Sequence, residues 1–77
     1  MIWYFKKLTE DNNIAVYSYT TVKDDTEPGK ISYDKSTEKI TVVQKAINDK
    51  LGIEWAESSF WNVINEKFPD KRVVAIG

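Results

Sequence analysis

The spacing of the apolar residues changes once along this chain of 77 residues, and that change constrains the fold more than any other feature. As far as Val43, β-branched and aromatic residues form short segments separated by turn signals, which is typical of strands. From Ala56 to Phe68 the apolar residues recur at intervals of three and four, the period of an amphipathic helix. Such a pattern favours the α+β class.

Four strands are predicted before the helix and one after it. The predicted strands are Ile2–Leu8, Ile14–Lys23, Lys30–Tyr33, Lys39–Val43 and, at the end, Arg72–Ile76. Pro28-Gly29 is the strongest break between them, and Pro69 ends the helix predicted over Trp55–Lys67. We therefore expect one compact domain over residues 1–77, an antiparallel sheet of about five strands in the order β-β-β-β-α-β with one helix packed on one face.

The segment before the helix supports a second interpretation. Thr41 followed by Gln44 is a capping-box pattern, and Gly52 could end a helix that began there. We favour a strand that continues through Val43. Whether Lys45–Leu51 forms a short helical turn remains open at this stage.

Composition limits how the domain is stabilised. The chain has no Cys and no His, so disulfides and zinc sites are excluded, whereas three Trp, four Tyr and three Phe can build a core by packing alone. The absence of Cys fits a reducing cytoplasm, and no apolar run reaches the roughly 20 residues that a membrane-spanning helix needs. A cytoplasmic location is therefore expected.

Enzyme chemistry finds little support in the sequence. Without His or Cys, the common general bases and thiol nucleophiles are missing. Ser58 and Ser59 could be imagined as nucleophiles with Lys67 as base, but they are more simply solvent-facing residues of the helix. No glycine-rich phosphate loop occurs. We expect no catalytic activity and no cofactor.

Two groups of carboxylates were considered as metal ligands. Asp24, Asp25 and Glu27 are the densest group, but the alternating ligand pattern of a calcium loop is missing, so a solvated turn is expected. Glu54 and Glu57 could share one helical face, yet no second pair accompanies them. No metal site is predicted.

The first two strands are apolar on both faces, which is the feature that points to a partner. A half-exposed strand should alternate apolar and polar residues. Here Trp3, Phe5, Tyr17 and Tyr19 fall on one face, while Ile2, Tyr4, Ile14 and Val16 fall on the other. One helix of about 13 residues spans roughly 20 Å and can cover only one face. The Lys45–Glu54 segment covers the other face, a second molecule covers it, or it stays exposed to solvent, as a sheet face with tyrosine tolerates.

A protein-interaction module without catalytic activity is the function that this reasoning favours, self-associating through its sheet by contacts of Trp3, Phe5, Tyr17 and Tyr19. Its partner would be another protein or a second copy of the chain. Trp55 projects away from the apolar stripe of the helix, and Trp61 lies at its margin.

Two alternatives stay open. Aromatic rings on a sheet could stack nucleic-acid bases, although acidic residues are interspersed with the lysines along the chain, which makes nucleic acid unlikely. A small ligand could bind between helix and sheet, beside Tyr33, Phe60 and Ile64.

Overall fold

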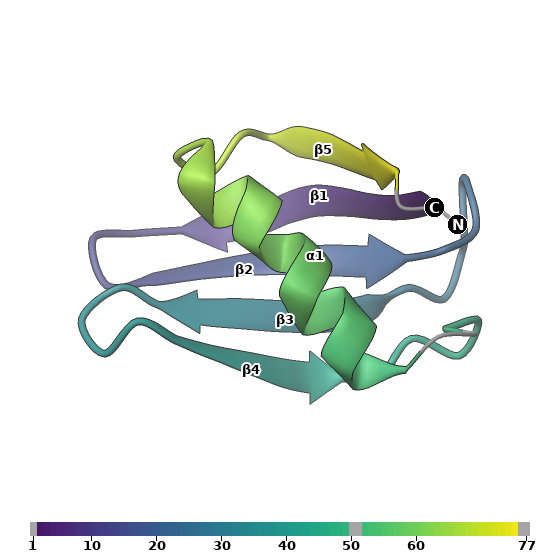
Figure 1. Cartoon of the computed structure of the whole chain (residues 1–77), viewed down its shortest axis with the longest axis horizontal. Coiled ribbons are helices and arrows are strands. Elements are labelled where there is room, and N and C mark those ends of the chain that lie inside the picture. The colour runs from purple at the N-terminus through teal and green to yellow at the C-terminus, as the bar shows by residue number, and fades with distance from the viewer. Residues whose placement is uncertain (1, 50–51, 76–77) are drawn as a thin grey trace.

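The computed structural model describes residues 2–49 and 52–75 and has the predicted α+β architecture. Its elements are β1 (Ile2–Glu10), β2 (Ile14–Thr20), β3 (Gly29–Asp34), β4 (Lys39–Gln44), α1 (Ile53–Asn65) and β5 (Lys71–Ala75). The order β-β-β-β-α-β is thereby confirmed (Figure 1). In the part of the chain that the structure describes, no helix has the length and apolar character needed to span a membrane.

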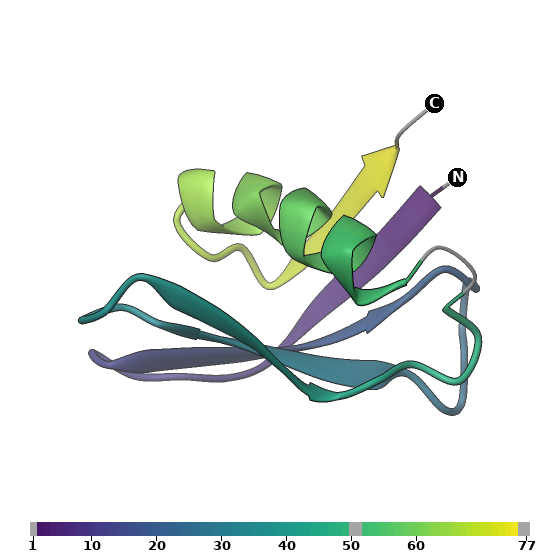
Figure 2. The same ribbon diagram turned by 60° about the horizontal axis from the view of Figure 1, so that its bottom comes forward.

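The sheet has the strand order β4-β3-β2-β1-β5, and neighbouring strands are antiparallel. The first four strands form a meander, and α1 then crosses the sheet diagonally so that β5 can pair with β1 (Figure 1). Figure 2 shows that α1 lies on one side of the sheet only. The result is a two-layer fold with one covered and one uncovered sheet face.

The element boundaries differ from the prediction by up to three residues, most of all at the end of β2. β2 ends at Thr20 and not at Lys23, because the Thr20 hydroxyl donates to the Asp25 carboxylate (2.6 Å) and turns the chain. The helix begins and ends two residues earlier than predicted. It stops at Asn65 because Lys67 and Phe68 adopt left-handed backbone conformations, with φ of 62° and 61°.

The helical interpretation of the segment before α1 is wrong. Thr41 lies within β4, and residues 45–49 form no helix. Lys50 and Leu51 lie outside the described residues, as does Ile76 of the predicted last strand. The capping-box pattern fails here because β4 pairs with β3 along its whole length, from Asp34–Lys39 to Lys30–Gln44.

The core lies between α1 and the covered face. Ala56, Phe60 and Val63 form the buried stripe of α1, as their spacing predicted. The Phe60 ring packs on Phe5 and Tyr17, with ring centroids 5.5 and 5.4 Å apart. Aromatic packing therefore joins the helix to the two central strands of the sheet.

The expectation that Trp3, Phe5, Tyr17 and Tyr19 are exposed is wrong. They do share one face, but it is the face that α1 covers, and their exposed fractions are 0–2%. The reason is energetic, because the helix buries more apolar area on large rings than on the smaller side chains opposite.

Two of the buried rings also hold the connections around the core. The Tyr17 hydroxyl donates a hydrogen bond to the Pro69 carbonyl oxygen at 2.5 Å, and burial raises the pKa of this hydroxyl. The Tyr19 hydroxyl accepts a hydrogen bond from the Ala46 N–H at 3.0 Å. Burial raises the pKa of Tyr19 as well, although the hydrogen bond from Ala46 opposes the shift. The polar ends of both rings are therefore satisfied inside the fold.

Candidate functional site

The sheet face opposite α1 has no helix packed on it, and we call it the open face (Figure 2). Because side chains alternate along a strand, the neighbours of the buried core residues point to this side. The open face includes Ile2, Tyr4, Lys6, Leu8 and Thr9 of β1; Ile14, Val16 and Ser18 of β2; Lys30, Ser32 and Asp34 of β3; Lys39, Thr41 and Gln44 of β4; and Lys71 and Val73 of β5.

A row of polar residues, rich in lysine, crosses the middle of the open face. In strand order from β5 to β4, this lysine row contains Lys71, Lys6, Ser18, Lys30 and Gln44, each directly opposite the next. The ion pairs of the described residues use other cations, namely Lys7, Lys35 and Arg72. Within residues 2–49 and 52–75, the three lysines of the row therefore have no carboxylate within 4 Å.

Apolar side chains lie on both sides of the lysine row. On one side Tyr4 faces Val73, which is 50% exposed, and Ile2 lies beside them. On the other side Leu8 and Ile14 are also exposed, and Val16 is partly buried. The open face therefore has a cationic middle and two apolar flanks.

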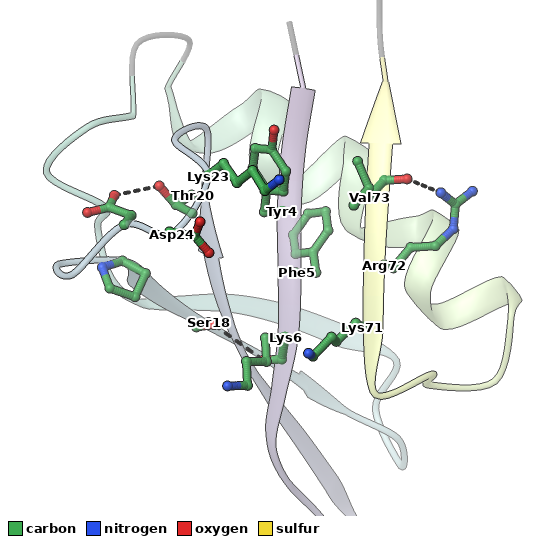
Figure 3. Close-up of a pocket in the computed structure, with 12 residues that line it drawn as sticks. Tyr4, Phe5, Lys6, Ser18, Thr20, Lys23, Asp24, Lys71, Arg72 and Val73 are labelled. Atoms are coloured by element: carbon green, nitrogen blue, oxygen red, sulfur yellow. Dashed lines mark hydrogen bonds between the residues drawn. The ribbon is translucent and has the colours of Figure 1, made fainter.

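A shallow hollow of about 380 Å³ lies at one end of the open face (Figure 3). β1 and β5 supply Tyr4, Lys6, Lys71 and Val73 to its wall, and the loop after β2 supplies Lys23 and Asp24. Figure 3 shows Lys6 and Lys71 at the same level of the two neighbouring strands, with Tyr4 above them. The hollow widens the open face into a concave surface beside the lysine pair.

The acidic turn next to this hollow has a structural role. The Asp25 carboxylate accepts hydrogen bonds from the Thr20 hydroxyl, the Glu27 N–H (2.9 Å) and the Asn48 side chain (3.1 Å). These bonds lower the pKa of Asp25, with the Thr20 bond as the largest cause. Among the described residues, no group of three or more carboxylates lies close enough to hold a metal ion.

The outer surface of α1 is the second exposed surface with an unusual composition. Trp55 is 54% exposed and Trp61 is 42% exposed. The Trp61 ring also packs edge-on against the Tyr33 ring, with ring centroids 5.9 Å apart. Glu54 and Glu57 lie on the same helix, which contains no basic residue. The predictions that Trp55 points away from the apolar stripe of the helix and that Trp61 lies at its margin are therefore confirmed. We call Ile53, Glu54, Trp55, Glu57 and Trp61 the helix surface.

One edge of the sheet is blocked by its own side chain. The Arg72 guanidinium donates to the Val73 carbonyl oxygen and, at 2.6 Å, to the Glu66 carboxylate. In Figure 3 this carbonyl points away from β1, toward the outer edge of β5. A strand from another molecule would have to displace Arg72 to pair there. Contact through the open face or the helix surface meets no such obstacle.

The residues considered for catalysis do not converge. Ser59 is 4% exposed and faces the core, contrary to the expected solvent-facing position, whereas Ser58 is exposed. Tyr33 and Phe60, considered as walls of a ligand pocket, are core residues, and Ile64 packs against that core.

The four rings singled out in the sequence are brought together, but in the core. The lysine row was missed because it depends on pairing between β1 and β5, whose residues are far apart in the chain. Strand alternation placed Ile2, Tyr4, Ile14 and Val16 on the opposite face, and this signal could have identified part of the open face.

Comparison with family models, with curated proteins and with solved structures found no match to this chain.

Proposed function

We propose that this chain is a small non-catalytic interaction module that binds protein and self-associates through the open face of its sheet. The observation that carries the proposal is the open face itself, where apolar side chains remain exposed on both sides of a lysine row that has no carboxylate within 4 Å among the described residues. Exposed apolar residues grouped on one surface are typical of a protein contact site. A chain without Cys suits the cytoplasm, to which we assign the module.

A protein partner explains the open face better than a nucleic acid does. Base stacking on a sheet uses aromatic rings. On the open face, Tyr4 supplies the aromatic ring among the described residues, while Trp3, Phe5, Tyr17 and Tyr19 are buried. The apolar flanks would contribute nothing to binding a phosphate backbone, but they would bury area against the apolar side chains of a protein.

The size of the surface suits a weak and reversible association. The chain exposes 4927 Å², so an interface of about 600 Å² per copy, at the low end for specific complexes, would use about an eighth of its surface. Sedimentation measurements should therefore extend from about 10 µM to about 1 mM, and the average mass of the wild-type chain should rise above 8.9 kDa with concentration.

Val73→Thr tests the open face with little change of shape. Removing this exposed apolar contact should weaken association at least fivefold. Val22→Thr is the matched control, because Val22 is 40% exposed but lies in the loop after β2. Its association should equal that of the wild type.

A wild-type chain that stays monomeric up to 1 mM would overturn the proposal. So would an unchanged association of Val73→Thr. If the monomer instead binds a labelled single-stranded oligothymidine with a steep salt dependence that Lys6→Thr removes, the open face is a nucleic-acid surface.

A further inference from the structure

The lysine row disfavours contact between two open faces. A two-fold dimer through this face would bring a second set of lysines against the first, and like charges across an interface are unfavourable. Asp34 is at the far end of the face, and its carboxylate already accepts hydrogen bonds from the N–H and hydroxyl of Ser36. Asp24 lines the hollow beside Lys6 and Lys71, but no carboxylate of the described residues lies within 4 Å of these lysines, so they remain available to a partner's carboxylates.

The helix surface of the same chain has the missing charge. Glu54 and Glu57 are the charged residues of α1, and neither has an ion pair within 4 Å among the described residues. Carboxylates three residues apart on a helix lie about 5–6 Å apart. Lys6 and Lys71 are directly opposite each other on neighbouring strands, which separates them by about 4.5–5.5 Å. The two charged pairs therefore match in spacing as well as in sign.

The apolar residues match in spacing along β1, at right angles to the direction that separates Lys6 from Lys71. On the helix surface, Ile53 precedes the two carboxylates and Trp61 follows them. Ile53 and Trp61 are about 12 Å apart along the helix axis. On β1, Tyr4 and Leu8 lie on either side of Lys6 and are about 13 Å apart. A helix laid along β1 would therefore set its apolar ends on the two flanks of the open face and its carboxylates beside Lys6, with Lys71 on the neighbouring strand.

On these grounds, and resting on the proposed self-association, we infer that the open face of one copy binds the helix surface of another. The contact is head-to-tail. Because α1 and the open face lie on opposite sides of the sheet, the copy that binds through its open face keeps its helix surface free, and the copy that binds through its helix surface keeps its open face free (Figure 2). Such an interface does not close on itself as a two-fold dimer does, so copies add in an open chain.

Two variants separate this arrangement from a two-fold dimer. Lys6→Thr/Lys71→Thr removes the lysine pair and leaves the helix surface intact, whereas Glu54→Gln/Glu57→Gln removes the carboxylates and leaves the open face intact. In a head-to-tail contact each change should weaken association at least tenfold. In a two-fold contact of open faces, the glutamine variant would associate like the wild type, and the threonine variant would associate more tightly because repulsion is relieved.

Mixing the two variants gives the decisive result. The helix surface of the threonine variant can still bind the open face of the glutamine variant. An equimolar mixture should therefore form pairs of twice the 8.9 kDa chain mass and no longer species. The wild type should form longer species as well. Glu38→Gln is the control, since it removes a carboxylate in the turn between β3 and β4, outside α1. Circular dichroism should verify that each variant is folded.

The possible failures are distinguishable. A monomeric wild type ends both the proposed function and this inference. A wild type that associates while the glutamine variant associates equally well, or a mixture that forms no pairs, overturns the head-to-tail contact and leaves self-association standing.

Discussion

Lys6 of β1 lies directly opposite Lys71 of β5, so that two lysines of the same face are neighbours across the sheet, and no carboxylate of the described residues lies within 4 Å of either. Like charges in such a cross-strand pair destabilise a sheet. We therefore expect the pair to lower the stability of the isolated chain, as for residues whose partner lies on another molecule.

Replacing one member of this pair should stabilise the monomer. We expect Lys71→Thr to raise the free energy of unfolding by about 0.2–1 kcal/mol, since it removes the repulsion and introduces a good strand former. Urea unfolding at low protein concentration measures the change, with Lys45→Thr as the control outside the strands. The gain should shrink in high salt. A loss of stability would mean that the two lysines do not repel each other.

Tyr17→Phe should lower the free energy of unfolding by about 0.5–1.5 kcal/mol, because it removes the hydrogen bond to the Pro69 carbonyl oxygen and nothing else. This bond joins β2 to the connection between α1 and β5. Tyr33→Phe is a suitable comparison, because Tyr33 is a core ring whose hydroxyl makes no hydrogen bond within the described residues. Equal effects of the two substitutions in thermal unfolding would contradict a role for the bond.

Gly29→Ala should be among the most harmful small substitutions in the chain. An added Cβ would lie 2.5 Å from the Gln44 carbonyl oxygen and 2.5 Å from the Ala46 nitrogen, which are main-chain atoms. We expect a loss of about 1–3 kcal/mol, as for an overpacked core. At Gly52 a Cβ meets nothing within 4 Å, but φ is +102°, so Gly52→Ala isolates the backbone strain. Denaturation midpoints should fall further for Gly29→Ala than for Gly52→Ala.

Lys67→Gly should stabilise the fold. Lys67 has a φ of 62°, a conformation that costs a residue with a Cβ about 1–2 kcal/mol and that glycine adopts freely. Part of this gain is cancelled by the greater freedom of glycine in the unfolded chain, so we expect a net increase of about 0.3–1 kcal/mol. Asn65→Gly, within the last turn of α1, should have the opposite sign. The same sign for both would refute the assignment of strain to Lys67.

Acid should destabilise the chain through its hydrogen-bonded carboxylates. Hydrogen bonds from Lys35 and Lys7 lower the pKa of Glu10, and those from Ser36 and Thr37 lower the pKa of Asp34. Because the unfolded chain binds protons first, this stability is present above the ordinary carboxyl pKa values of 3.8–4.5 and is lost as the pH falls through the lowered values. Urea midpoints measured from pH 7 to pH 2 should decline mainly below about pH 5. Asp34→Asn should make the decline shallower, and an unchanged slope would argue against its part in it.

Local pattern was sufficient for most of the architecture. The three- and four-residue spacing of Ala56, Phe60 and Val63 predicted α1 and its buried stripe correctly, because a helix presents such residues on one face whatever it packs against. The capping-box pattern at Thr41 wrongly suggested that a helix begins there. Pairing of β4 with β3 outweighed this local preference for helix.

The sequence by itself determined that the first strands are apolar on both sides and that one helix can cover only one of them. It also grouped Trp3, Phe5, Tyr17 and Tyr19 on a single face. Which face α1 covers was decided only in the folded chain, because that choice depends on the total area buried between helix and sheet. The lysine pair likewise exists only through tertiary structure. Lys6 and Lys71 are 65 positions apart, and the register between β1 and β5 brings them together.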